Sequence, residues 1–333
     1  MPAKPEQFKV IKEHGFKAAC FSIALRPNTA KAVFGSADFK VYEVDFTAPK
    51  FEPKELYAHE SYVTGVTLAG ATVVSGGYDC KLTWFDSAAG KVIKSETAHN
   101  KWIRGVFASK DGKTVASVAD DMVAKLWDGV TGKLLYELKG HAEKTPTNFN
   151  SMLYAAAFTD DGKTLATGDK VGKIILWDVA TGKKANEMDA PVFYTWDAAQ
   201  RNHSIGGIRS LTFSPDGKTL AVGGIGKIGN IDHLEGKARV ELFDVPSAKR
   251  TWEYQSDKFT GLVNHLQFAP DGSWLLGAGG ANEGFYLFLD PVAKKAVRQE
   301  KAGMHVHDVA TTPAMDVLYA AGHNKLVVCE CKG

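Results

Sequence analysis

Apolar and polar residues alternate along short segments of this chain, and turn sequences separate the segments. Within residues 98–139, four such segments follow one another at 102–106, 114–117, 124–128 and 134–138. The intervening turns include Asp-Gly-Lys at 111–113 and Thr-Gly-Lys at 131–133, where glycine supplies the positive φ that closes a hairpin. The pattern predicts a unit of four short antiparallel strands.

The same unit recurs along the chain, and each copy closes on an acidic residue. The closing acids are Asp45, Asp86, Asp128, Asp178, Asp244, Asp290 and Glu330. Successive acids are 41, 42, 50, 66, 46 and 40 residues apart. A period of about 40–45 residues that closes on Trp-Asp is typical of propeller blades, which stabilise one another by stacking. The sequence therefore predicts an all-β fold, a single seven-bladed β-propeller of four-stranded antiparallel blades.

One domain over residues 1–333 accounts for the whole repeat. The expected blades are residues 14–55, 56–97, 98–139, 140–189, 203–255, 256–299, and 300–333 together with 7–13. The seventh unit ends three residues after its third strand, whereas residues 9–12 repeat the Lys-Val-Ile-Lys of the fourth strand at 91–94. We therefore expect the N-terminal strand to complete the last blade and close the ring, which removes an exposed sheet edge.

The repeat resembles that of WD-repeat proteins over essentially the whole chain. Segments 214–221 (Ser-Pro-Asp-Gly-Lys-Thr-Leu-Ala) and 176–183 (Leu-Trp-Asp-Val-Ala-Thr-Gly-Lys) are similar to bacterial members of that family. In this family a His, a Ser or Thr, an Asp and the Trp form a hydrogen-bonded tetrad inside a blade. The resemblance implies such a tetrad in the third unit, which matches all four positions. Its members are His99, Ser117, Asp121 and Trp127.

The other units depart from this pattern. The second has Phe85 in the Trp position, and the fourth has Val171 in the Asp position. The first keeps only His14 and Asp38. The last three have Lys237, Glu283 and His323 in the Asp position. We therefore expect the C-terminal half to depend more on apolar packing than on such networks.

Composition and charge narrow the function. The 40 basic and 38 acidic residues are interspersed, so no electrostatic feature indicates a nucleic acid or a membrane partner. The four cysteines fall in predicted strands without metal or redox spacing, and neither a signal peptide nor a membrane span is recognisable. A cytoplasmic location is expected.

Three features that resemble chemical sites have simpler explanations. Residues 224–229 match GxGxxG, but strand residues follow instead of a helix that could hold a pyrophosphate. The Gly-Lys-Thr triplets, of which 112–114 is the first, lie in predicted turns. His305 and His307, with His203, His233 and His323, lack a neighbouring carboxylate or cysteine at ligand spacing. We expect no metal, no cofactor and no catalytic residues.

Insertions collect at one end of the predicted blades. They are residues 142–151, 189–206 and 224–238, whereas the opposite end carries only tight turns. Functional residues often lie in such loops, so the insertions indicate a recognition surface; the alternative is that they are tolerated extensions.

The resemblance also implies where a partner would bind. WD-repeat proteins contact partners through the residue that starts each first strand and the residue before the turn Asp. The expected partner-binding residues are Tyr62, Tyr78, Trp102, Asp120, Met152, Lys170, Leu262 and His305, with Ala19, Ala37 and Gly207 at equivalent positions. The leading hypothesis is a non-catalytic scaffold that binds a protein or peptide near blades two to five, alone or within a larger assembly. The alternative is a small-molecule-binding or enzymatic propeller with a pocket framed by 189–206 and 224–238.

Overall fold

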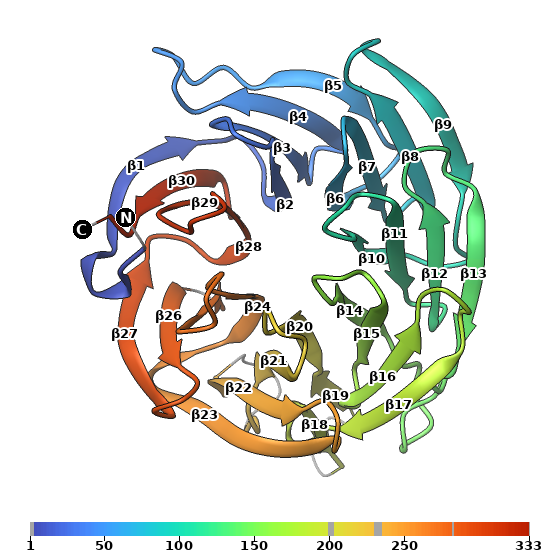
Figure 1. Cartoon of the computed structure of the whole chain (residues 1–333), viewed down its shortest axis with the longest axis vertical. Coiled ribbons are helices and arrows are strands. Elements are labelled where there is room, and N and C mark those ends of the chain that lie inside the picture. The colour runs from blue at the N-terminus through green and yellow to red at the C-terminus, as the bar shows by residue number, and fades with distance from the viewer. Residues whose placement is uncertain (1–2, 199–202, 230–234, 282, 333) are drawn as a thin grey trace. The chain divides into compact units, whose positions relative to one another are not determined.

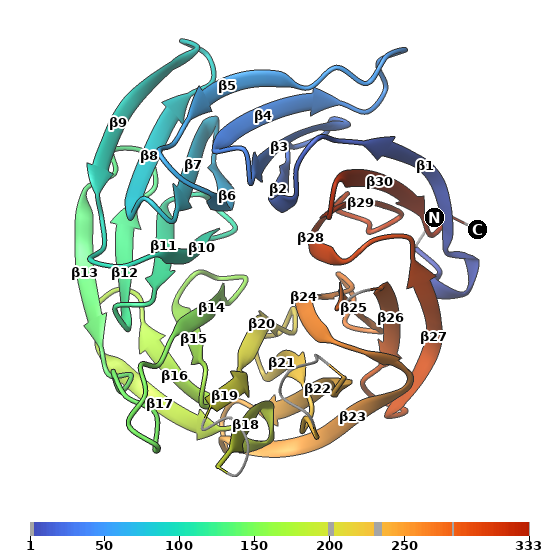
Figure 2. The ribbon, with the colours of Figure 1, turned by 180° about the vertical axis from the view of Figure 1, so that it is seen from behind.

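The computed structural model describes residues 3–198, 203–229, 235–281 and 283–332 (Figures 1 and 2). Almost all regular structure in these residues is β-strand. The two helices that they form, η1 (Pro5–Gln7) and η2 (Pro191–Phe193), are single 3-10 turns, and neither is long or apolar enough to cross a membrane. The chain divides into two compact units, residues 1–119, 125–136 and 306–333 in the first and residues 120–124 and 137–305 in the second.

The first unit contains blades 7, 1 and 2 and most of blade 3. Blade 1 is β2 (Cys20–Leu25), β3 (Lys31–Ser36), β4 (Lys40–Asp45) and β5 (Lys54–Ala58). Blade 2 is β6 (Val63–Ala69), β7 (Thr72–Gly77), β8 (Lys81–Asp86) and β9 (Lys91–Thr97). Blade 3 is β10 (Ile103–Ala108), β11 (Thr114–Ala119), β12 (Val123–Asp128) and β13 (Leu134–Lys139). Blade 7 is β28 (Val306–Thr311), β29 (Val317–Gly322), β30 (Lys325–Glu330) and β1 (Lys9–Gly15).

The second unit contains blades 4, 5 and 6 and one additional hairpin. Blade 4 is β14 (Leu153–Phe158), β15 (Thr164–Asp169), β16 (Lys173–Asp178) and β17 (Lys184–Asp189). The hairpin is β18 (Tyr194–Asp197) and β19 (His203–Gly206). Blade 5 is β20 (Ile208–Phe213), β21 (Thr219–Ile225), β22 (Lys237–Asp244) and β23 (Lys249–Thr260). Blade 6 is β24 (Leu262–Phe268), β25 (Leu275–Gly280), β26 (Gly284–Asp290) and β27 (Lys295–Ala302). The prediction of an all-β, seven-bladed propeller with four-stranded antiparallel blades is confirmed.

The N-terminal strand completes the last blade, as predicted. β1 pairs with β30 from Lys9 opposite Glu330 to Gly15 opposite Lys325, and the strand lies about two residues later than the expected 7–13. The Lys4 N–H also donates to the Cys331 carbonyl (2.8 Å). In both views β1 runs along β30, close to the two ends of the chain (Figures 1 and 2).

Tight turns join the strands as their sequences predict. Gly112 has φ +70°, and the equivalent Gly162, Gly217 and Gly272 have φ between +69° and +74°. An aspartate fixes each of these turns; Asp111, for example, accepts bonds from the Ser109 hydroxyl (2.7 Å) and the Lys113 N–H (3.0 Å). The turns hold the blades in register and leave the apolar faces free to pack.

The apolar core lies between neighbouring blades. In the first unit, Val74 and Trp84 of blade 2 pack with Ile103 and Val115 of blade 3. In the second unit, a similar cluster joins blades 4 and 5, and another joins blades 5 and 6. Burial of one large apolar side chain stabilises the folded state by about 1.5–3 kcal/mol, so these interfaces are a main source of stability.

Polar networks cross the buried faces of blades 2, 3 and 4. In blade 3, His99 Nε2 (2.7 Å) and the Trp127 indole N–H (2.9 Å) both meet the Ser117 hydroxyl, as the predicted tetrad requires. Asp121 of the same tetrad accepts the Val123 N–H in its turn (3.2 Å). These contacts satisfy polar groups whose burial would otherwise be costly.

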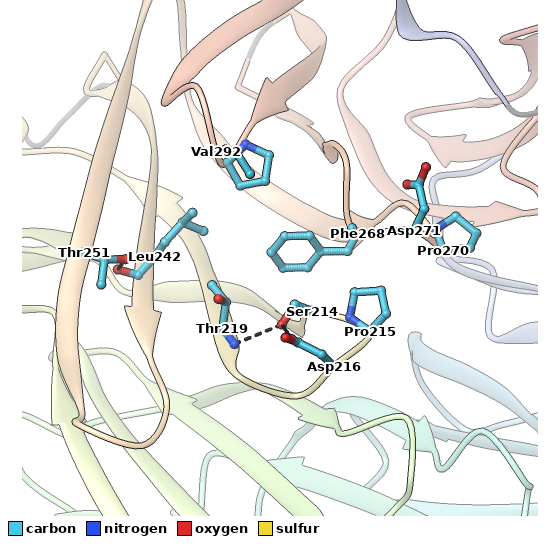
Figure 3. A pocket seen from close by; sticks show the side chains of 12 residues that line it. Ser214, Pro215, Asp216, Thr219, Leu242, Thr251, Phe268, Pro270, Asp271 and Val292 are labelled. Carbon is cyan, nitrogen blue, oxygen red and sulfur yellow. Dashed lines mark hydrogen bonds between the residues drawn. The ribbon is translucent and has the colours of Figure 1, made fainter.

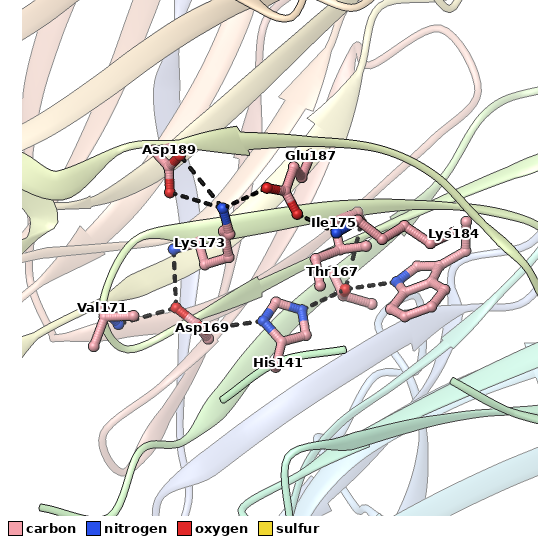
Figure 4. A network of polar contacts seen from close by, with 10 residues as sticks. His141, Thr167, Asp169, Val171, Lys173, Ile175, Lys184, Glu187 and Asp189 are labelled. Atoms are coloured by element: carbon pink, nitrogen blue, oxygen red, sulfur yellow. Dashed lines mark hydrogen bonds and ion pairs between the residues drawn. The ribbon is translucent and has the colours of Figure 1, made fainter. Parts of the chain in front are cut away.

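Blades 2 and 4 complete their networks with residues that the sequence comparison did not identify. In blade 2 the Ser75 hydroxyl bonds the Tyr57 hydroxyl of β5 in blade 1 (2.9 Å), which takes the role of the indole that Phe85 lacks. In blade 4, Asp169 replaces the absent turn aspartate at Val171, and its carboxylate meets His141 Nδ1 (2.8 Å). Figure 4 shows His141 between Asp169 and Thr167. The blade 4 network therefore contains an acid although Val171 occupies the usual Asp position.

Blade 5 contains a network of a different kind. Arg239 and Glu241 of β22 are both buried and pair at 2.6 Å, and Arg239 also pairs with Glu253 (2.6 Å). Arg250 of β23 donates to Glu241 as well (3.2 Å). Blade 5 thus combines a buried ion-pair network with the apolar packing expected of the C-terminal half.

Candidate functional site

An exposed aromatic stack marks the first unit. The rings of Tyr78 and Trp102 lie nearly parallel, with centroids 4.4 Å apart and an interplanar angle of 7°. The Arg104 guanidinium lies 5.1 Å from the Tyr78 centroid and 5.5 Å from that of Trp102, and it donates to the Tyr78 hydroxyl (2.5 Å). Trp102 is nevertheless 49% exposed. Arg104 thus holds the two stacked rings in place, while the Trp102 ring stays accessible to solvent.

Further rings extend this stack across neighbouring blades of the same unit. Tyr62 lies 5.7 Å from Tyr78, and Phe21 and Phe39 lie 5.8 Å and 5.6 Å from Tyr62. His307 lies 5.1 Å from Phe21, and His323 lies 4.7 Å from His307. The aromatic surface, as we name it, consists of Phe21, Phe39, Tyr62, Tyr78, Trp102, Arg104, His307 and His323. Ring pairs at these separations attract one another, which limits their mobility.

Backbone hydrogen bonds explain why side chains from two distant sequence positions meet here. The residue before each first strand accepts a bond from the residue that follows the second strand. The Tyr78 N–H donates to the Tyr62 carbonyl (2.9 Å), and Ala37 and Lys170 bond Ala19 and Met152 in the same way (2.8 Å each). The blade geometry therefore presents both positions side by side. Phe39 joins the surface from a turn position with φ +73°.

The structure brings together only part of the predicted set. Tyr62, Tyr78 and Trp102 contact one another in the first unit, whereas the other five residues belong to the second unit. Of those five, Met152 is half-buried and the others are buried. They are Asp120, Lys170, Leu262 and His305. Phe21, Phe39, Arg104, His307 and His323 were not predicted as part of this surface. Their aromatic or cationic character near the ends of strands is the only sequence signal that could have indicated them.

The three insertions contact one another within the second unit. In the insertion at 142–151, the Thr147 hydroxyl bonds the Tyr194 hydroxyl (3.2 Å) of the β18–β19 hairpin. Phe149 packs on Trp196 of that hairpin, with ring centroids 5.2 Å apart. The third insertion joins through the Ile228 N–H, which donates to the Thr195 hydroxyl (3.1 Å). Residues 199–202 and 230–234 of these insertions lie outside the described residues.

The motifs set aside in the sequence also have ordinary structural roles in the described residues. Gly224 and Ile225 pair with Arg239 and Ala238 on β22, so the glycine-rich segment begins in a β-ladder. Within the described chain, no cluster of three or more His, Cys, Asp or Glu residues could hold a metal ion. His233 and the His203 side chain are not among the described groups.

A pocket of about 400 Å³ lies in the second unit, between blades 5 and 6 (Figure 3). Its lining includes Ser214, Asp216, Phe268 and Asp271 and the apolar residues Pro270 and Val292. These residues belong to strands and tight turns, not to the insertions at 189–206 and 224–238. Hydrogen bonds from Ser214 and the Lys218 N–H lower the pKa of Asp216. Because the same bonds stabilise the turn, this carboxylate has a structural role.

Comparison with known proteins agrees with this architecture. The family model for the WD domain, G-beta repeat, matches residues 90–128, 132–178 and 198–227. Nuclear distribution protein PAC1 of Arthroderma benhamiae (strain ATCC MYA-4681 / CBS 112371) is 34% identical over 65 residues, which cover 20% of this chain and 14% of that protein. Nuclear distribution protein nudF of Aspergillus niger (strain ATCC MYA-4892 / CBS 513.88 / FGSC A1513) is 29% identical over 98 residues, or 27% and 22% of the two chains.

A third relative comes from a plant. The Notchless protein homolog of Arabidopsis thaliana is 31% identical over 100 residues, which cover 29% of this chain and 21% of that protein. The similar segments thus span less than a quarter of each of these relatives. The chain thus contains repeats that match the WD domain, G-beta repeat, and its strands form seven four-stranded blades.

Proposed function

We propose that this chain is a non-catalytic scaffold that binds a protein or peptide through the aromatic surface. The observation that carries the proposal is the Tyr78–Trp102–Arg104 stack, in which Trp102 stays half-exposed although its ring is held in one orientation. A rigid aromatic side chain loses little entropy when a partner covers it. Aromatic and arginine side chains also dominate the binding energy of protein interfaces.

The position of the surface refines the initial hypothesis. The expected sector was blades two to five, next to the insertions. The rings instead extend from blade 3 through blades 2 and 1 to blade 7. Contiguous exposed apolar surface of this kind is typical of interaction sites. The proposed partner therefore contacts mainly the first unit.

Two observations support a binding role over a catalytic one. Asp79, His59 and Ser75 are bonded in sequence, at 2.9 Å and 2.7 Å, in the order of a catalytic triad. Ser75 is completely buried, however, so its hydroxyl cannot reach a substrate. The pocket between blades 5 and 6 contains no histidine or cysteine among its lining residues. A cytoplasmic location and a place in a larger assembly are part of the proposal.

Paired truncations test this proposal. Trp102→Ala and Tyr78→Ala should each weaken partner binding at least tenfold, equivalent to ~1.4 kcal/mol. The melting temperature should change by only a few degrees, because both side chains lie at the surface. The partner is first identified by co-purification of the wild-type chain with mass spectrometry, and binding is then measured by calorimetry.

Tyr136→Ala provides the matched control, since Tyr136 is an exposed aromatic residue on the outer strand β13. Proteins that the wild type and the control capture, but that both truncations lose, are partners of the aromatic surface. If both truncated variants retain every partner, or if both unfold, the proposal is wrong and the rings have a structural role.

A further inference from the structure

Gly207 occupies, in blade 5, the position that Trp102 occupies in blade 3. Each residue directly precedes the first strand of its blade. Gly207 has φ +105°, and a Cβ added there would lie 2.9 Å from the Lys170 Cα and 3.0 Å from the Tyr154 ring. Only glycine permits this close approach. As a result, Lys170, Tyr154 and the start of β20 meet around one point in the second unit.

Arg209 follows on β20 with part of its hydrogen-bonding capacity unused. Its guanidinium carbon lies 3.7 Å from the Tyr154 ring centroid, and one terminal nitrogen donates to the Gly206 carbonyl (3.1 Å). Its Nε–H is buried and has no acceptor among the described residues. The equivalent Arg104 in blade 3 instead donates to a tyrosine hydroxyl. The stacking therefore fixes the Arg209 plane while leaving a donor free.

Lys170 is the second cation at this point, and it is only 7% exposed. Within the described part of the chain, no carboxylate pairs with Lys170 or with Arg209. The adjacent Asp169 is already occupied by His141 and by the Lys173 N–H (2.9 Å). The Lys170 charge therefore has no carboxylate counter-ion among the described residues.

The hairpin next to Lys170 adds polar groups. Tyr194 pairs with Gly206 across β18 and β19, and its hydroxyl meets Thr147. Burial alone would raise the pKa of Tyr194, but hydrogen bonds with Thr147, Thr145 and Ser204 and the nearby charge of Lys170 lower it overall. The Lys170 charge therefore acts on the Tyr194 hydroxyl.

We infer that Lys170 and Arg209 form a binding site for a single oxyanion group, a phosphate or a carboxylate. The planar guanidinium, held on Tyr154, offers directed N–H donors, and the ammonium adds a second charge. An anion would accept from the terminal N–H groups of Arg209 and supply a counter-charge for Lys170. The site uses none of the residues of the aromatic surface, so it does not depend on the function proposed above.

Calorimetric titration with sodium phosphate at low ionic strength tests the site directly. The wild-type chain should bind one phosphate, and Lys170→Met and Arg209→Gln should each weaken binding at least tenfold. Lys163→Met, at an exposed lysine, serves as the control and should bind as the wild type does. No binding by the wild type, or equal binding by all three variants, would overturn the inference.

Two further measurements identify the source of the anion and guard against a folding artefact. Tighter binding of N-acetyl-phosphoserine amide or N-acetyl-aspartate amide than of inorganic phosphate supports an acidic side chain as ligand, whereas the reverse order supports a free anion. Without phosphate, Lys170→Met should melt at or above the wild-type temperature, because it removes a charge with which no carboxylate of the described residues pairs. A clearly lower melting temperature would show that Lys170 has a structural partner, which would contradict the inference.

Discussion

At the scale of single residues, His14 shows how burial controls protonation in this fold. Its imidazole stacks on Phe51 with centroids 4.3 Å apart and an angle of 20°. Its Nε2 is buried and has no hydrogen-bond partner in the described residues. Burial, and secondarily the charge of Lys12, lower the pKa of His14 below the ordinary value of 6.5. This histidine thus packs as a neutral aromatic ring instead of joining a network.

The lowered pKa predicts a pH-dependent contribution to stability. Below about pH 6.5 the unfolded chain binds a proton at His14 that the folded chain resists, so unfolding becomes easier as the pH falls. The contribution is complete above the unfolded pKa and is lost toward the folded pKa. His14→Phe keeps the ring and removes the titration. Its melting temperature should therefore fall less than that of the wild type between pH 7.5 and pH 5, as measured by calorimetry. Parallel curves would show that His14 does not contribute.

Repeat positions explain which residues of the polar networks in blades 2, 3 and 4 could be predicted from the sequence. His59, His99 and His141 recur at one position of the repeat, so alignment of the repeats is sufficient to find them. Tyr57 and Asp169 reach their partners from other positions, and only the distances between folded strands reveal them. A hydrogen bond needs the correct geometry, not a conserved repeat position.

At the scale of elements, the buried charges of β22 replace the histidine network. Glu241 is fully buried, and its Oε1 accepts Arg239 and Arg250. Its Oε2 has no partner in the described structure. Removal of one member of a buried ion pair leaves an uncompensated charge, whereas replacement of both by apolar residues is often tolerated. The stability of blade 5 should therefore depend on the pair, not on either residue.

Substitutions in β22 distinguish the loss of one member of the Arg239–Glu241 ion pair from the replacement of both. Arg239→Met should lower the free energy of unfolding by about 3–5 kcal/mol, because Glu241 then remains buried with only the longer contact to Arg250. The double variant Arg239→Met, Glu241→Leu should recover most of this loss. Equilibrium urea unfolding measures both. If the double variant is no more stable than Arg239→Met, the pair is not the source of the effect.

Strands and turns were predictable because their signals are local, while contacts among the insertions were not. The alternating pattern and the Asp-Gly-Lys turns act within a few residues, and the turn glycines have the expected positive φ. Thr147 and Tyr194, in contrast, meet across 47 residues of sequence. Nothing in the local pattern of either segment indicates that contact.

At the scale of the whole molecule, the sequence specifies the fold repeatedly and the binding surface only once. Each of the seven units carries strand and turn signals, so one weak unit does not change the predicted architecture. The aromatic surface depends on a few exposed side chains that differ from blade to blade. Sequence reasoning found Tyr62, Tyr78 and Trp102 and missed Phe21 and Phe39, because the repeat has no feature that marks exposure.

The pairing of β1 with β30 predicts how the chain responds to truncation. Deletion of residues 1–13 removes most of the β1–β30 ladder, namely the pairs from Lys9–Glu330 to Glu13–Val327. It also removes the ion pair between Glu13 and Lys325 (2.7 Å). Several net hydrogen bonds of about 1 kcal/mol each would be lost. The melting temperature should therefore fall by roughly 10 °C or more, since each kcal/mol shifts a chain of this size by about 2–4 °C.

A shorter deletion and an added peptide separate the loss of this strand from a general effect of truncation. Deletion of residues 1–3 leaves the Lys4 bond to Cys331 in place and should melt as the full chain does. The longer deletion exposes the edge of β30, so the variant should also aggregate on heating. A synthetic peptide of residues 7–15 should bind that edge and restore the melting temperature. If the longer deletion melts like the full chain, β1 is dispensable and the last blade is stable with three strands.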